Sequence, residues 1–122
     1  MTETSPDTTP RADAFPEPAV DEIHLEAVLH ALADPVRLRI VSSLAECAGE
    51  VNCLAFDVPV AKSTLTHHFR VLREAGVIRQ VRRGTSKMNT LRGEDLAARF
   101  PGLLDSVVAG YRDCHRPGGA GA

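Results

Sequence analysis

The sequence predicts a small, mainly helical domain with one β-hairpin. Apolar residues recur at helical spacing in several separate stretches, and two short β-prone runs flank a Gly turn late in the chain. The core should be aliphatic, because the 122 residues include no Trp, one Tyr and four Phe. A chain of this length fits a single domain with a modest core, which pairing with a second copy would enlarge.

Residues 1–18 hold four prolines and few apolar side chains, which is typical of a disordered tail. A helical pattern then begins near Val20 and places apolar residues at i, i+3, i+4 and i+7: Leu25, Val28, Leu29 and Leu32. We expect this first helix to stop at Asp34, because Pro35 disfavours the α conformation in the residue before it.

A second helix should follow at once, since Asp34 suits an N-cap and Pro35 suits the first helical position. The helical pattern continues to about Glu46. A short third helix is expected over residues 51–56, followed by a turn at 57–59. These segments lead into residues 62–75, the clearest amphipathic pattern of the chain, which ends at Gly76. Its inward-facing residues are Leu65, Phe69 and Leu72.

The C-terminal third of the chain predicts a hairpin and a last helix. Strand, turn and strand are expected at 77–82, 83–85 and 86–91. Residues 93–99 should form a short helix or a turn. The last helix again shows apolar residues at i, i+3, i+4 and i+7: Leu104, Val107, Val108 and Tyr111. We therefore expect one folded domain over residues 19–113 and a flexible C-terminus over 114–122.

The formal net charge of -2 hides a strong asymmetry. Residues 62–92 contain eight Lys or Arg and one Glu, whereas residues 1–34 contain eight Asp or Glu and one Arg. A polyanion responds to such local charge rather than to the overall balance. For the acidic residues 1–18, a passive tail is the default expectation. The alternative is that the tail tunes affinity by presenting acids near the basic face.

Residues 51–91 combine a short helix, a tight turn, a longer helix and a basic hairpin, the pattern of a winged helix-turn-helix. With the flanking helices, the expected element order of the domain is α-α-α-α-β-β-α. The second helix of such a unit enters the major groove, and the hairpin contacts flanking phosphates or the minor groove. We expect polar and basic residues outside the buried stripe to contact DNA: Lys62, Ser63, Thr64, Thr66, His67, Arg70, Arg73, Arg82, Arg83 and Lys87. A merely solvated charged face is disfavoured, because the hairpin adds charge of the same sign.

Two blocks of the sequence resemble the ArsR/SmtB family of bacterial transcription regulators. Residues 31–40 read ALADPVRLRI, similar to the family's opening motif, and residues 62–78 read KSTLTHHFRVLREAGVI, similar to its recognition helix. Arg82-Arg83-Gly84 sits where the wing of the family turns. The resemblance covers about residues 20–111. It implies a repressor that binds an operator and is often released by a metal or another signal, although activation stays open.

The same resemblance implies a homodimer paired through the first and last helices. The expected interface residues are Leu25, Val28, Leu29, Leu104, Val107, Val108 and Tyr111. His67 and His68 look like the family's His pair, so we expect His67 to face DNA and His68 to pack internally. Ala61 departs from the family pattern, which usually has Ser as the helix cap. The loss costs about 1 kcal/mol unless Ser63 caps a shortened helix.

The nature of the signal stays open at this point. Family members that sense metal use a Cys-x-Cys pair or an Asp-x-His pattern. In this chain, Glu50 and Asn52 take the places of the two cysteines, and Asp105-Ser106-Val107 lacks the His. Neither pattern is intact, so a bound transition metal is only one candidate cofactor. The remaining candidate ligands are Cys47, Cys53, Cys114, His115, His24 and His30. One Cys and one His do not close a tetrahedral site, but a dimer could combine them.

A thiol switch is the second idea, since Cys47 lies at the end of the second helix and Cys114 at the end of the last. An organic ligand, or a constitutive regulator with no signal, is the third. An enzyme is disfavoured, because the chain lacks Gly-x-Ser-x-Gly, HExxH and phosphate-loop motifs. The basic hairpin argues against a purely protein-binding module. The absence of a long apolar run or secretory signal favours the cytoplasm and no membrane partner.

Overall fold

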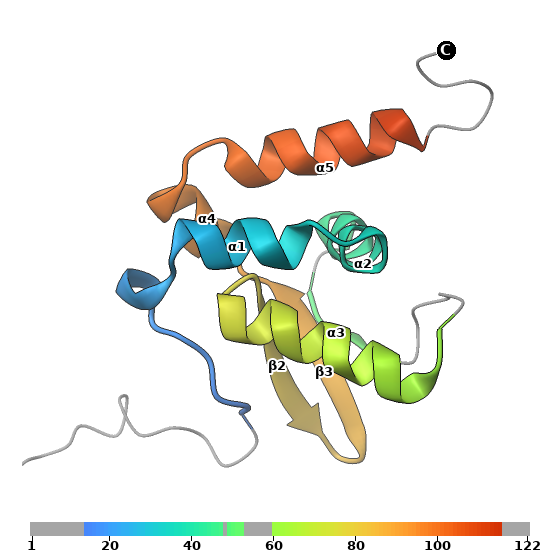
Figure 1. The fold of residues 1–122 in the computed structure, drawn as a ribbon. Coiled ribbons are helices and arrows are strands. Elements are labelled where there is room, and N and C mark those ends of the chain that lie inside the picture. The colour runs from blue at the N-terminus through green and yellow to red at the C-terminus, as the bar shows by residue number, and fades with distance from the viewer. Residues whose placement is uncertain (1–13, 48, 53–59, 116–122) are drawn as a thin grey trace, which may run out of the picture.

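The computed structural model describes residues 14–47, 49–52 and 60–115. Its helical elements are η2 (Val20–Glu22), α1 (Leu25–Leu32), α2 (Pro35–Ala45), α3 (Lys62–Ala75), α4 (Gly93–Arg99) and α5 (Leu103–Cys114). The strands are β1 (Val51–Asn52), β2 (Ile78–Arg83) and β3 (Ser86–Leu91). Figure 1 shows α1 lying between α5 and α3, with the β2–β3 hairpin projecting from this helical body. No helix of the described segments has the length and apolar character needed to cross a membrane.

The first expected helix is divided into η2 and α1. The residues between them, Ile23 and His24, are extended. Ile23 is fully buried and lies against Gly76, which accounts for the break: the chain leaves helical geometry to insert this side chain into the core. Helix α1 therefore starts at Leu25 and ends at Leu32, two residues before Asp34.

The start of α2 confirms the expected cap. Oδ2 of Asp34 accepts hydrogen bonds from the backbone N–H groups of Val36 at 2.9 Å and Arg37 at 3.1 Å, and Pro35 occupies the first helical position. These bonds satisfy donors that the first turn of a helix leaves without partners. The sharp corner between α1 and α2 is thus encoded locally.

The short helix expected from residue 51 is wrong at its start. Val51 and Asn52 form strand β1, which pairs antiparallel with Asn89 and Met88 of β3. The side-chain amide of Asn89 also donates to the carbonyl of Val51 at 3.0 Å. Strand pairing and this side-chain bond together give the backbone groups of β1 their partners. The rest of that helix prediction, residues 53–56, and the turn at 57–59 lie outside the described residues.

The hairpin and its flanking helices follow the sequence pattern closely. Strands β2 and β3 pair from Ile78 opposite Leu91 to Arg83 opposite Ser86, and the sheet order is β1-β3-β2. Helix α3 ends at Gly76, whose φ of 90° is left-handed. The core is aliphatic except for Phe69, and it joins all the helices to the start of β2: Ile23, Val28, Ala31, Leu32, Ile40, Val41, Leu44, Phe69, Leu72, Ala75, Val77, Ile78, Leu96 and Val108. The arrangement is a winged helix-turn-helix, with the β2–β3 hairpin as its wing.

Candidate nucleic-acid interface

Helix α3 presents a polar outer face. Phe69 and Leu72 turn inward and are 2% and 0% exposed. The opposite side chains are exposed: Lys62, Ser63, Thr64, Thr66, His67 and Arg70. As the sequence suggested, no side chain caps the helix at Ala61, and Ser63 lies inside the helix rather than capping a shorter one. The residues expected to contact DNA on this helix are therefore brought together on one accessible surface.

The inner face of α3 is held by a buried polar cluster. Nη1 of Arg37 lies 3.1 Å from Nδ1 of His68, while Nε of Arg37 donates to the carbonyl of Ala31 at 2.6 Å. Since the guanidinium can only donate, Nδ1 of His68 must accept, which requires a neutral imidazole with its proton on Nε2. Arg37 and His68 are each 8% exposed. His68 thus anchors α3 to the corner between α1 and α2, as its expected internal role requires.

The charges in this cluster shift two pKa values. Burial lowers the pKa of His68, and the charges of Arg37 and His67 lower it further. The Asp34 carboxylate, with an oxygen 3.8 Å from Nδ1, raises the same pKa but does not reverse the shift. Burial raises the pKa of Asp34, but backbone hydrogen bonds from Arg37 and Val36 and the charges of His68 and Arg37 bring it below its ordinary value. The cluster therefore favours a neutral His68 beside an ionised Asp34.

The wing carries the other expected DNA contacts, and they differ from one another. Arg82 is exposed and Lys87 is half-buried. Arg83 is held by Glu50, with Nη2–Oε2 at 2.6 Å and Nε–Oε1 at 3.1 Å. A bidentate pair of this kind fixes the guanidinium next to the first strand. Of these three side chains, Arg83 is the one that already has an acidic partner in the described structure.

A chain of hydrogen bonds joins α3 to the wing, and sequence reasoning missed it. Nη1 of Arg73 donates to Oε1 of Gln80 at 2.8 Å, and Nε2 of Gln80 donates to Oδ1 of Asn89 at 2.8 Å. Asn89 then donates to Val51, as noted above. Gln80 and Asn89 are 3% and 0% exposed. Polar residues at inward-facing strand positions were the available signal. Arg73, expected to touch DNA, has a structural partner here.

A groove of about 470 Å³ separates α3 from the wing. Within the described segments, its walls combine basic, polar and apolar side chains and no acidic one: Phe15, Asn52, Lys62, Leu65, Thr66, Phe69, Arg70, Arg73, Gln80, Thr85, Ser86 and Lys87. Recognition helix and wing thus form one continuous basic concavity. Such a surface can accept a phosphate backbone while the outer side of the helix meets base edges.

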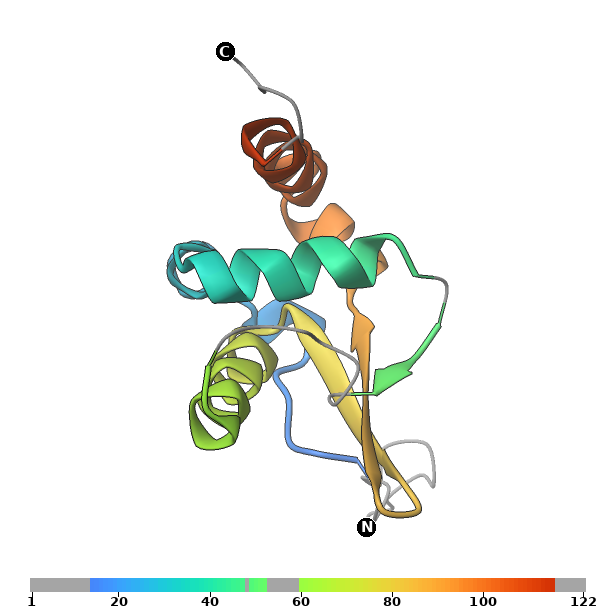
Figure 2. The same cartoon turned by 90° about the vertical axis from the view of Figure 1, so that its right-hand side faces the viewer.

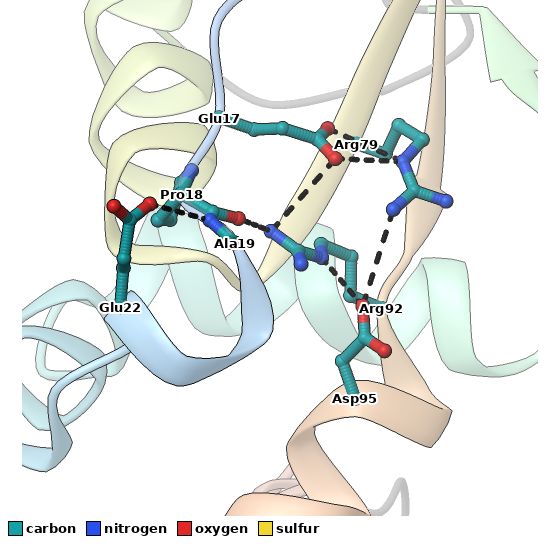
Figure 3. Close-up of polar contacts among 7 residues, drawn as sticks. All are labelled: Glu17, Pro18, Ala19, Glu22, Arg79, Arg92 and Asp95. Carbon is teal, nitrogen blue, oxygen red and sulfur yellow. Dashed lines mark hydrogen bonds and ion pairs between the residues drawn. The ribbon is translucent and has the colours of Figure 1, made fainter. Parts of the chain in front are cut away.

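Two cations of the basic segment are neutralised at the base of the wing, as Figure 3 shows. Nε of Arg79 donates to both carboxylate oxygens of Glu17, at 3.2 and 3.0 Å. Nε of Arg92 donates to Asp95 at 2.9 Å, and the Arg92 side chain is 3% exposed. The charge count of residues 62–92 therefore overstates the charge that DNA would meet.

The residues expected at a dimer interface divide into two sets. Leu25 and Leu29 of α1 are 43% and 46% exposed. Leu104, Val107 and Tyr111 of α5 are half-buried. Val28 and Val108, by contrast, are 1% and 7% exposed and belong to the protomer's own core, so they have little surface to offer a partner.

The candidate signal residues are scattered. Cys47 follows the C-cap of α2 and Cys114 is the last residue of α5, and both thiols are exposed. An Arg112–Glu46 ion pair at 3.4 Å links these two ends of the helices. His24 and His30 are exposed on the α1 side. The ring of His115 stacks on Tyr111 at 4.1 Å, and Cys53 lies outside the described residues. Within the described segments, no three His, Cys, Asp or Glu side chains gather as a metal site would require.

Comparison with known proteins gives consistent matches. Residues 34–80 match the family described as bacterial regulatory protein, arsR family. YceK of Bacillus subtilis, an uncharacterised HTH-type transcriptional regulator, is 29% identical over 71% of this chain and 88% of YceK. MJ1325 of Methanocaldococcus jannaschii, described in the same words, is 32% identical over 48% of this chain and 66% of its own. The crystal structure of an ArsR family transcriptional regulator aligns with a TM-score of 0.56 at 25% identity, over 67% of this chain and 90% of that one.

Proposed function

Because the chain belongs to the ArsR family of bacterial regulatory proteins, a family of transcriptional regulators with a DNA-binding helix-turn-helix, we propose that it represses transcription by binding an operator as a homodimer. A signal then releases it. Since its proposed ligand is an operator in bacterial DNA, we place it in the cytoplasm.

One observation carries the proposal: the basic groove continues into an exposed, polar recognition face. Lys62 and Arg70 on α3 and Lys87 on the wing line the same concavity, and no acidic side chain lines it in the part of the chain that the structure describes. Contacts to phosphates would fix the register of the protein on the duplex. Ser63, Thr66 and His67 are then free to read base edges, since none of them is buried.

Apolar side chains at the surface of α1 and α5 support a homodimer paired through these two helices. Leu25 and Leu29 lie one helical turn apart on α1 and leave there an exposed apolar stripe that a second copy could cover. Helix α5 offers the half-buried Leu104 and Tyr111 to such an interface. A two-fold dimer built in this way would set its two recognition helices about 34 Å apart, one turn of DNA.

For the signal, the thiols are the better-supported candidates. Cys47 and Cys114 are exposed, and the Arg112–Glu46 ion pair links the helix ends that carry them. An oxidant such as diamide would take two electrons and two protons from this thiol pair and leave a disulfide. Peptide mass spectrometry would detect the Cys47–Cys114 cross-link. C47S and C114S each should abolish both the cross-link and any oxidant-induced release from DNA.

Selection of duplexes from a random pool, followed by fluorescence anisotropy across a salt series, tests the DNA-binding proposal. We expect a near-palindromic site, and a slope of about −4 to −5 in log K against log salt if roughly four to six phosphates are neutralised. The double variant R82A/R83A should weaken binding. L25D/L29D should yield monomers in sedimentation. The proposal would be refuted if the wild-type protein were a monomer and bound none of the duplexes at low salt.

A further inference from the structure

Residues 14–19, here called the strap, run along β2 toward the tip of the wing (Figure 2). Ala14 forms a β-bridge with Val81, and the backbone N–H of Phe15 donates to the carbonyl of Gln80 at 3.2 Å. These residues were expected to belong to a disordered tail ending at residue 18. Instead, the segment from Ala14 onward extends the sheet at the outer edge of β2.

The C-terminal end of the strap is clamped at the base of the wing. Both carboxylate oxygens of Glu17 accept from Nε of Arg79, and Nη1 of Arg92 donates to the carbonyl of Pro18 at 2.8 Å (Figure 3). Arg92 is in turn held by Asp95. The exposed Glu17–Arg79 pair and the part-buried Arg92–Pro18 bond at one end, and the β-bridge at the other, give the strap a defined path.

Between these anchors, the side chain of Phe15 enters the groove between α3 and the wing. Three cations surround its ring: Arg73 at 5.3 Å, Arg82 at 5.4 Å and Lys87 at 5.6 Å from the ring centroid. Each distance suits an attraction between a cation and the negative face of the ring. All three cations are among the residues expected to contact DNA. The strap therefore occupies cations and space that a phosphate backbone needs.

We propose that the strap is an intramolecular competitor of DNA, so that the groove accepts either Phe15 or a duplex backbone. The inference rests on the proposed DNA-binding function. If only the strap-open form binds tightly, the apparent affinity falls in proportion to the open fraction. Any partner that captured the strap would then strengthen DNA binding without touching α3.

The opposite role, a strap that reaches out as a DNA-binding arm, fits the chemistry poorly. Arms that enter the minor groove use Arg or Lys. Residues 14–19 read AFPEPA and contain no cation, and Glu17 brings a negative charge to the base of the wing. An acidic segment beside a phosphate backbone is repelled, whereas the same segment beside Arg79 is attracted.

Two matched pairs of full-chain variants test the competition. F15A empties the groove without changing the charge, and P16A alters the exposed neighbour as its control. E17Q frees one end of the strap, and D21N removes one equal charge from the exposed η2 helix. Anisotropy with a labelled mixed-sequence duplex of about 30 base pairs, long enough for two half-sites, gives the affinity. Circular dichroism checks that each variant folds.

We expect F15A to tighten binding roughly three- to tenfold, the equivalent of one or two exposed cation–π contacts, and P16A to leave it unchanged. E17Q should tighten binding more than D21N. In hydrogen exchange, the Phe15 amide should be protected in the free protein and exchange faster in the complex. If the wild type binds DNA and F15A leaves that binding unchanged or weakens it, the strap proposal fails and the DNA-binding proposal stands. Greater protection of the Phe15 amide in the DNA complex would have the same meaning. If neither wild type nor F15A binds DNA at low salt, the proposed function fails as well.

Discussion

The recognition helix and the wing carry similar numbers of cations but hold them differently. On α3, Lys62 and Arg70 are exposed and meet no acidic side chain among the described residues. On the wing, Arg79 pairs with Glu17 and Arg83 with Glu50. The two remaining wing cations, Arg82 and Lys87, lie over Phe15. Lys62 and Arg70 can therefore bind DNA without leaving an internal partner, whereas the wing cations, and Arg73 on α3, must first give up internal contacts. Counting charges along the sequence does not reveal this difference.

The joint between the two regions should be the most sensitive position. Gly76 ends α3 with a φ of 90°, and an added Cβ would lie 2.6 Å from Cγ1 of Ile23. G76A therefore adds a steric clash to a strained backbone, and we expect a loss of about 2–4 kcal/mol in the free energy of unfolding. Urea denaturation measures it. G84A is the matched control, because its φ is 64° but its Cβ would meet nothing within 4 Å. Equal losses for both variants would show that the clash with Ile23 is relieved cheaply.

The next effect separates the inside of α3 from its outside. H68A removes the acceptor of Arg37 in a buried cluster, so we expect a loss of about 1–3 kcal/mol in unfolding free energy. H67A, the exposed neighbour, should leave stability nearly unchanged and weaken DNA binding instead. If H67A destabilised the fold as much as H68A, the assignment of reading and anchoring roles would be wrong.

The same cluster predicts a pH dependence of stability. Because the folded state lowers the pKa of His68, the unfolded chain binds more protons below the ordinary His value of about 6.5. Stability should therefore fall as the pH drops below that value. A second loss should follow at lower pH, where Asp34, whose folded pKa is also lowered, becomes protonated. Denaturation at pH 7 and pH 5 measures the first step, which H68Q should reduce. An unchanged slope in H68Q would assign the step to other groups.

Most of the fold could be predicted because its signals are local. The Asp34-Pro35 cap, the apolar stripe of α3 and the stop at Gly76 each depend on residues within a few positions. The errors fall where tertiary contacts override local preference. Ile23 breaks a helix to reach the core, and β1 pairs with a strand more than thirty residues away.

The DNA-contacting face of α3 was also predictable, because exposure alternates with burial along a single helix. The state of the wing cations was not. Glu50 lies 33 residues before Arg83, and Glu17 lies 62 residues before Arg79. Pairs at such separations leave no periodic trace in a single sequence. The buried Gln80–Asn89 contact was missed for the related reason that strand polarity alone does not reveal a partner.

The contrast between helix and wing can be sharpened with single cations. R70A removes a cation of α3 that has no acidic partner in the described structure, so we expect about a tenfold loss of DNA affinity and a salt slope smaller in magnitude by about 1. R83A removes a cation already paired with Glu50 and should cost clearly less. R112A, on α5, serves as the control for total charge. Anisotropy across a salt series measures all three, and a larger loss for R83A than for R70A would reverse the comparison.

The smallest expected effect releases a wing cation instead of removing it. E50Q deletes the acidic partner of Arg83, which is 46% exposed, and an exposed ion pair of this kind contributes at most about 1 kcal/mol. We therefore expect DNA affinity to rise about twofold at low salt. E46Q removes the same charge from the pair with Arg112 on α5, which is not among the residues of the groove, and should change affinity less. Anisotropy with both variants at one low salt concentration decides the point. Equal gains would mean that DNA senses only the net charge, and that the Glu50–Arg83 pair does not limit the wing.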